Sequence, residues 1–171
     1  HGTGAMGSMP APEEATGEGT SRPRLVTANV QLARPFNLGN TAWRFTTALR
    51  GQWSQTPLVP QDRFSIGGRY TVRGFDGELT LAADRGWLIR NDLALTLGHS
   101  TNEMYVALDH GQVAGQSAQY LTGNKLTGTA IGLRGAIDHV SYDVFWSWPL
   151  YMPQGFQTSS STGGFSLTWF Y

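Results

Sequence analysis

Apolar and polar residues alternate with a period of two over most of the chain after position 24. The clearest stretch is 41–54, which has tryptophan near both ends of one face and two arginines on the other. Its apolar face contains Trp43, Phe45, Leu49 and Trp53, and its polar face contains Arg44 and Arg50. Successive side chains of a β-strand point to opposite faces, so the pattern predicts a strand and not a helix.

Further stretches alternate in the same way. They are 26–32, 89–97, 103–109, 131–138, 140–148 and 165–171. Together with 41–54 they predict seven strands of roughly 9–14 residues, which is the length that a tilted strand needs to cross a membrane. The chain is therefore expected to be all-β and antiparallel.

The predicted connections between these strands alternate in length. Short turns are predicted at 35–40, 99–102 and 139, and long connections at 55–86, 112–127 and 149–163. Outer-membrane barrels have short turns on the periplasmic side and long loops outside. A soluble β-sandwich would show the same alternation of residues, but it gives no reason to sort loops by length. The pattern favours part of an antiparallel transmembrane β-barrel.

Composition removes several classes of function. The twelve basic and twelve acidic residues cancel, so nothing favours nucleic acid as a partner. The absence of cysteine excludes a disulfide scaffold and any cysteine-based metal or redox site. No apolar run approaches the ~18 residues of a transmembrane helix.

No group of residues favours an enzyme or a metal site. None of the four histidines has metal-ligand spacing with another, and the alternation points His110 away from the face that carries Asp109. No serine lies in a nucleophile motif. We therefore expect no catalytic residues, no metal and no cofactor.

The chain divides into three parts. Residues 1–9 are small, glycine-rich and without a pattern, as in a cloning scar. Residues 10–24 have the composition of a disordered linker or loop. Residues 25–171 form the predicted barrel portion, which includes the long loop 55–86.

The loop 55–86 is too long for a passive hairpin, and loops of this length are usually functional or disordered. Its Phe64, Ile66 and Phe75 suit ordered packing. An apolar loop with many glycines would fold back into the barrel lumen, where Arg73 would need a carboxylate partner. Period two places Asp109 on the lumen-facing side of its strand.

The sequence FSIGGRYTVRGFDGE resembles the VRG(F/Y) element in the sixth extracellular loop of two-partner secretion transporters, the TpsB family. The stretches DRGWLIRNDL and PLYMPQGF and the aromatic terminus are also similar to that family, so the resemblance covers about 25–171. It implies a transporter in the outer membrane of a Gram-negative bacterium. Its partner would be an exoprotein of the haemolysin, adhesin or contact-dependent toxin type, secreted as an unfolded polypeptide without a cofactor.

A second family motif, (F/G)-x-D-x-G, is matched at Asp109 and Gly111, but alanine stands at its first position. The resemblance implies that the loop enters the lumen as a hairpin in which Arg73 pairs with Asp109. The residues of this lumenal latch are Val72, Arg73, Gly74, Phe75, Asp109 and Gly111. Alternatively, the Arg73–Asp109 pair only braces the barrel.

The last predicted strand alternates through Phe165, Leu167, Trp169 and Tyr171, as in a C-terminal signal read by the barrel-assembly machinery. By resemblance the chain supplies the last seven strands of a sixteen-stranded barrel that contacts outer-membrane lipid. Its open strand edges would then favour self-association. Two other functions stay open: a related protein that inserts barrels into the membrane, and a small standalone barrel that acts as a pore or adhesin.

Overall fold

The computed structural model describes residues 17, 19, 23–98 and 100–171. The expected cloning scar at 1–9 and most of the expected linker at 10–24 lie outside these residues. His99, which was expected in a turn, also lies outside them.

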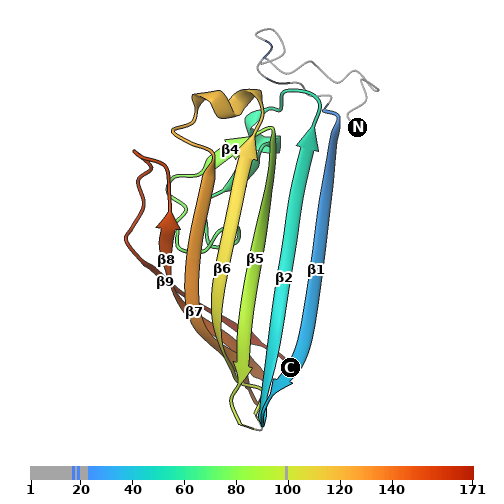
Figure 1. Ribbon diagram of the computed structural model, residues 1–171, viewed down its shortest axis with the longest axis vertical. Helices are drawn as coiled ribbons and strands as arrows, with labels where there is room; N and C mark the ends of the chain where they lie inside the picture. Colours follow the sequence, from blue (N-terminus) through green and yellow to red (C-terminus); the bar gives the residue numbers. More distant parts are fainter. Residues whose placement is uncertain (1–16, 18, 20–22, 99) are drawn as a thin grey trace.

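Seven long strands form one antiparallel sheet (Figure 1). They are β1 (Leu25–Leu38), β2 (Thr41–Ser54), β5 (Arg85–Thr96), β6 (Glu103–Ala114), β7 (Lys125–Ile137), β8 (Val140–Tyr151) and β9 (Thr162–Trp169). Each pairs with the next long strand along the chain, and β1 and β9 are the outer strands. The predicted all-β antiparallel architecture with seven long strands is confirmed.

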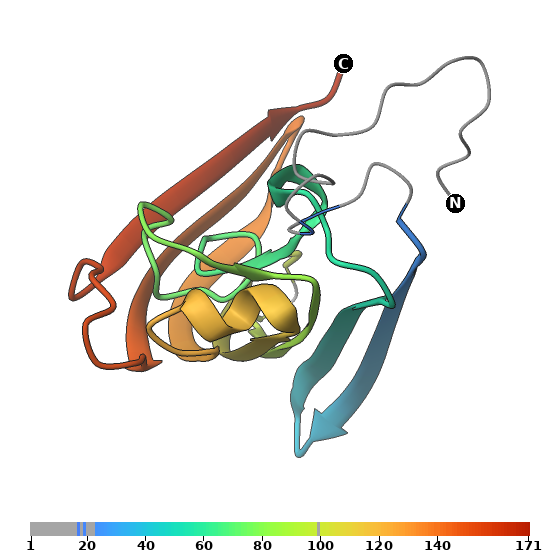
Figure 2. The same cartoon turned by 90° about the horizontal axis from the view of Figure 1, so that it is seen from above.

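The sheet curves, and the segment between β2 and β5 lies on its concave side (Figure 2). This segment contains the 3-10 helix η3 (Pro60–Asp62) and the short strands β3 (Phe64–Ile66) and β4 (Leu81–Ala83). A second 3-10 helix, η4 (Gln116–Tyr120), follows β6. These connections lie at one end of the sheet, and short turns at 39–40, around 97–98 and 100–102, and at 138–139 lie at the other (Figure 1). In the described part of the chain, no helix is long and apolar enough to cross a membrane.

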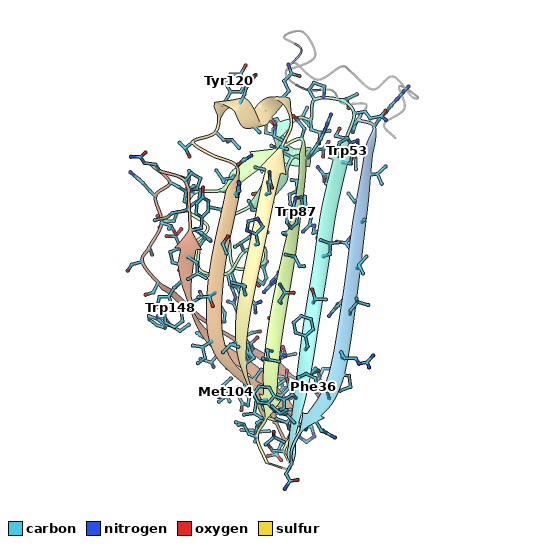
Figure 3. All side chains as sticks on the ribbon, in the orientation of Figure 1. Phe36, Trp53, Trp87, Met104, Tyr120 and Trp148 are labelled. Carbon is cyan, nitrogen blue, oxygen red and sulfur yellow. The ribbon has the colours of Figure 1, made fainter. Side chains whose placement is uncertain are left out.

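The convex face of the sheet carries the apolar side chains that the alternation predicted. Leu49, Val106 and Ile131 are exposed there. Figure 3 shows Trp53 and Trp87 toward the end with the long connections, and Phe36 and Met104 toward the other end. No second sheet covers this face among the described residues, so the apolar positions are not the core of a soluble sandwich.

Three sequence predictions are corrected. The expected turn at 35–40 is shorter, because β1 continues to Leu38 and Pro35 pairs with Arg44. Proline is tolerated there because β1 is an outer strand of this sheet. Asp138 was expected in a strand but lies in a turn at φ 49°. Tyr171 was expected in register with the last strand, yet β9 ends at Trp169.

Candidate functional site

The VRGF hairpin, residues 64–83, lies against the concave face of the sheet. Its two strands pair from Phe64 opposite Ala83 to Ile66 opposite Leu81. The hairpin joins residues of the sheet in one buried apolar cluster. The cluster contains Phe64, Ile66, Val72, Phe75, Leu81, Ala83, Leu88, Val113, Leu126 and Phe156. Burial of apolar side chains therefore holds the hairpin against the concave face of the sheet, which is the wall of the barrel portion. The charged contacts fix the orientation in which the hairpin binds.

Arg73 is the charged residue at the centre of the hairpin contact. Its Nε donates to Asp109 Oδ2 at 2.6 Å, and its Nη2 donates to Asp109 Oδ1 at 2.6 Å. The backbone N–H of Arg73 also donates to Asp109 Oδ2 at 3.0 Å, and Nη2 reaches Asp92 Oδ1 at 2.6 Å. Arg73 is 5% exposed and Asp109 is fully buried. The bidentate geometry fixes the position of the guanidinium as well as its charge.

Burial disfavours the charged form of Arg73, but its hydrogen bonds to Asp109 and the negative charges of Asp109 and Asp92 outweigh burial and raise its pKa. Arg73 therefore keeps its charge although it is buried.

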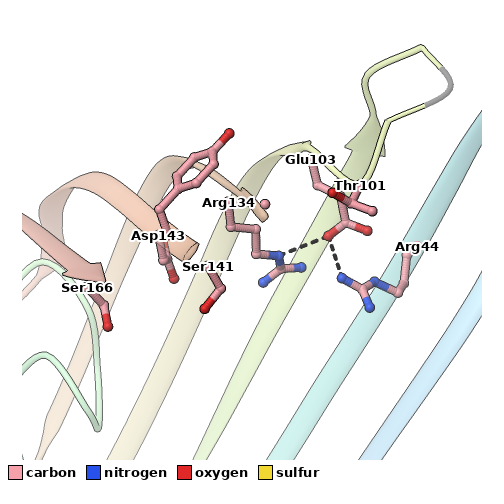
Figure 4. A pocket seen from close by; sticks show the side chains of 9 residues that line it. Arg44, Thr101, Glu103, Arg134, Ser141, Asp143 and Ser166 are labelled. Atoms are coloured by element: carbon pink, nitrogen blue, oxygen red, sulfur yellow. Dashed lines mark hydrogen bonds and ion pairs between the residues drawn. The ribbon is translucent and has the colours of Figure 1, made fainter. Parts of the chain in front are cut away.

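The Arg73–Asp109 pair belongs to a longer charge network, in which basic and acidic side chains alternate. Its members, in order, are Arg90, Asp109, Arg73, Asp92, Arg134, Glu103 and Arg44. Arg134 lies 3.0 Å from Asp92. It lies at the same distance from Glu103, which also contacts Arg44 (Figure 4). The network runs from the buried hairpin along the concave wall to a more open end at Arg44. It makes this face hydrophilic while leaving few charges unpaired.

Two glycines allow the hairpin backbone to touch the wall. Gly74 has φ 101°, and a Cβ on it would overlap the backbone carbonyl of Trp148. A Cβ on Gly128, in β7, would overlap the carbonyl oxygen of Arg73. At Gly111 a Cβ would lie 3.0 Å from the side chains of Ile66 and Val72. The VRGF segment sits at its observed depth because these positions lack side chains.

The tip of the hairpin also contacts the connection between β8 and β9. Phe75 packs edge-on against Phe156, with ring centroids 5.7 Å apart. The Asp76 carboxylate accepts a hydrogen bond from the backbone N–H of Ser159 at 2.7 Å. This bond lowers the pKa of Asp76. The connection between β8 and β9 thus also holds the hairpin tip in place.

The base of the loop has a separate anchor at Asp84. Its carboxylate accepts from the backbone N–H of Leu58 at 2.9 Å, and from the backbone N–H and Oγ of Ser117 at 3.0 and 2.9 Å. Burial alone would raise the pKa of Asp84. The three donated bonds and nearby Arg63 outweigh burial and lower it below the ordinary value of 3.8.

Asp84→Asn is expected to destabilise the protein by about 1–3 kcal/mol near neutral pH, because charge-assisted hydrogen bonds are lost. Because folding lowers the pKa of Asp84, its contribution is fully present above 3.8 and disappears as pH falls through the folded value. The difference in thermal midpoint between wild type and variant should therefore shrink on acidification. Asp62→Asn is the control, since no hydrogen bond to the Asp62 carboxylate is found in the described structure. A pH-independent difference for Asp84→Asn would contradict this account.

The structure brings together all six residues of the expected latch. Val72, Arg73 and Phe75 are buried at the wall, and Asp109 and Gly111 face them from β6. His110 points the other way, as expected, and lies beside Trp87 with ring centroids 5.4 Å apart. The residues described contain no group of three potential ligands that could hold a metal ion.

Sequence reasoning missed several contacts of this site. Asp92 and Arg134 lie on inward positions of predicted strands, but no motif linked them to Arg73. Gly128, Phe156 and Asp84 were not singled out. The period-two pattern gave the face of Asp92, but nothing local gives its distance from Arg73. The sequence did contain one further signal of the hairpin contact, because Gly128 lies at an inward position of β7.

The four residues of the expected C-terminal assembly signal are not part of the latch. Phe165, Leu167 and Trp169 are exposed on the apolar face of β9, and Tyr171 follows the strand. They are thus placed on the convex side, away from the charge network.

Comparison with known proteins supports the resemblance. The family described as "Haemolysin secretion/activation protein ShlB/FhaC/HecB" matches residues 1–135. The "Outer membrane transporter CdiB-2" of Burkholderia pseudomallei (strain 1026b) is 37% identical over 171 residues, which cover 98% of this chain and 29% of that protein. The "Hemolysin transporter protein ShlB" of Serratia marcescens is 30% identical over 84 residues, 48% of this chain and 15% of that protein.

Solved structures give the same result for the fold. CdiB from Acinetobacter baumannii superposes with a TM-score of 0.79 at 35% identity, covering 86% of this chain and 27% of that one. CdiB from Escherichia coli gives a TM-score of 0.82 at 23% identity, covering 96% and 31%, and this similarity concerns the fold alone. The chain thus spans under a third of the length of these relatives. It belongs to the ShlB/FhaC/HecB family of haemolysin secretion/activation proteins, the two-partner secretion transporters.

Proposed function

We propose that this chain forms part of an outer-membrane β-barrel that secretes a partner exoprotein of the haemolysin, adhesin or contact-dependent toxin type. The observation that carries the proposal is the VRGF hairpin on the concave face, held there by Arg73 on a fully buried Asp109. The charge network gives the same face the polar surface that an unfolded polypeptide needs for passage. No catalytic step or cofactor is required for that role.

The convex face supports the membrane location in a Gram-negative outer membrane. Its exposed apolar side chains would face lipid, and residues 25–171 would form a barrel portion. The alternating β9 residues Phe165, Leu167 and Trp169, followed by Tyr171, are proposed to be read by the barrel-assembly machinery. The outer edges of β1 and β9 are proposed to drive self-association of the isolated chain.

Arg73 is proposed to act as a conformational latch and not only as a brace of the wall. Its side chain joins the loop hairpin to strand β6 of the barrel through charge-assisted hydrogen bonds. Such bonds hold one defined position and are lost together when the hairpin moves. The barrel strands keep their backbone hydrogen bonds in either position of the hairpin. The barrel can therefore stay folded when the latch is open.

Arg73→Ala tests this function in the full-length protein in cells that make the partner exoprotein. We expect secretion to fall about tenfold or more, in the range of coupling energies between sites. Because Arg73→Ala leaves Asp109 buried without its main partner, the barrel should also lose stability. Secretion is therefore compared per folded barrel, counted by gel migration, with a matched control, Arg50→Ala. Arg50, on β2, also faces inward and stacks over Phe64 at 5.5 Å, outside the charge network.

Two other results would count against the proposal in different ways. A loss of secretion that only matches the lost fraction of folded barrel would leave Arg73 as a brace. Secretion at the wild-type level would contradict both the latch and the brace as roles of Arg73.

A further inference from the structure

One end of the convex face has a hollow that the secretion function does not use. Across the strands, Ala28 pairs with Gly51, Gly51 with Trp87, Trp87 with Gln112, and Gln112 with Lys125. This row lies at the end of the sheet that carries the long connections (Figure 3). Under the proposed function that end lies at the outer leaflet.

The hollow exists because small residues separate two large ones. Trp53 and Trp87 flank a groove of about 440 Å³ whose other apolar lining residues include Val26, Ala28 and Ala114. A Cβ on Gly51 would make only ordinary contacts, none closer than 3.8 Å, so the floor of the groove is not tightly packed. The next row toward the membrane centre, Leu49 opposite Ile89, is apolar. The groove is therefore continuous with the apolar face.

Basic side chains border this groove. The guanidinium of Arg85 lies over the Trp53 ring at 4.2 Å, and its Nε donates to the Ser54 carbonyl at 2.9 Å. Arg24 lines a neighbouring hollow on the other side of Trp53, with Val26. Lys125 closes the row on β7. Within the described structure, every ion pair belongs to the charge network on the opposite face, so none involves these three groups.

We propose that the groove between Trp53 and Trp87 binds an acyl chain of a phosphorylated lipid of the outer leaflet, with its anionic headgroup against the basic side chains of Arg85 and Lys125. An apolar groove on a lipid-facing surface suits a hydrocarbon chain. Unpaired cations beside aromatic rings at the interface suit an anionic headgroup and not a zwitterionic one. The stacking on Trp53 and the bond to Ser54 hold Arg85 in place before any lipid arrives.

The inference rests on the proposed membrane location and orientation but not on the Arg73 latch. The test therefore uses full-length protein that has been shown by gel migration to be folded in a mild non-ionic detergent. A protein that fails to fold there would contradict the membrane location itself, whereas a folded protein without lipid selectivity would contradict only this inference.

Native mass spectrometry would count lipids retained after titration with lipid A that carries two phosphates, or with the same lipid after removal of its phosphates. Wild type should bind the phosphorylated form more tightly. Arg85→Gln and Lys125→Gln should each weaken its binding about fivefold, as expected for one basic side chain near an anionic surface, and leave the dephosphorylated form unchanged. Gly51→Val, which fills the groove, should weaken both forms.

Arg34→Gln is the matched control. Arg34 pairs with Phe45 on the same convex face of β1 but lies at the end with the short turns. Its loss should leave both affinities unchanged. Equal binding of the two lipids by wild type, or equal effects of Arg34→Gln and Arg85→Gln, would overturn the site. Normal binding by Gly51→Val would overturn the groove as the seat of the acyl chain.

Discussion

Asp109→Ala is expected to lower the free energy of unfolding by about 3–5 kcal/mol, the usual cost of removing one partner from a buried ion pair. The Asp109 carboxylate is fully buried and accepts three bonds from Arg73. Its removal leaves the backbone N–H of Arg73 without an acceptor and the guanidinium with Asp92 alone. Arg90, whose Nε lies 3.5 Å from Asp109, also loses its partner.

Urea unfolding of the full-length protein in lipid vesicles would measure this loss. Asp143→Ala is the control, because Asp143 is also an inward carboxylate but accepts from the neutral Tyr105 hydroxyl at 2.9 Å. It should cost only about 1 kcal/mol. An Asp109→Ala protein as stable as Asp143→Ala would show that the pair contributes little.

The double variant Arg73→Met with Asp109→Leu separates charge from position. Replacing a buried ion pair by apolar side chains is often neutral or stabilising, so most of the lost stability should return. Secretion should not return, because an apolar contact does not fix the hairpin in one place. Recovery of both would favour the bracing role of the pair.

Most of the fold could be predicted because a strand's face pattern is local. Alternation along 41–54 predicts β2 with its bounds, and the same reasoning places Asp109 inward on β6. The continuation of β1 through Pro35 could not be predicted in this way. Whether proline ends a strand depends on which strands are neighbours, and this is a property of the sheet and not of the segment.

The site was predictable only in part, for a related reason. The family motif singled out Arg73, and the alternation independently gave the face of Asp109. The second carboxylate, Asp92, is on the neighbouring strand β5. Its pairing with Ala107 places it near Asp109 and 2.6 Å from Arg73. The register between two strands depends on both of them, so no single window of sequence contains it.

Short elements inside the loop were also beyond sequence reasoning. β3 and β4 have three residues each, too few to show a period. They form because apolar residues such as Phe64 and Ile66 face the wall and the backbone then pairs. In this part of the chain, burial in the tertiary structure determines where the strands form, and the local sequence pattern does not.

Gly128→Ala is expected to reduce secretion at least as strongly as Arg73→Ala. The new methyl group would occupy the position of the Arg73 carbonyl oxygen, which is backbone and cannot rotate away. The VRGF segment must then leave the wall, and the bonds to Asp109 are lost with it. β7 itself tolerates alanine, so the strand ladder should remain.

Tryptic peptide mapping would detect the displaced hairpin directly. Arg73 is 5% exposed and should resist cleavage in the wild type, whereas cleavage after Arg73 should become rapid in Gly128→Ala. Gly51→Ala is the matched control, a strand glycine whose Cβ would have only ordinary contacts at 3.8 Å. Combining Gly128→Ala with Arg73→Ala should add little to either alone, because both remove the same contact. Additive losses would mean that Gly128 acts on secretion by a route that does not pass through the hairpin.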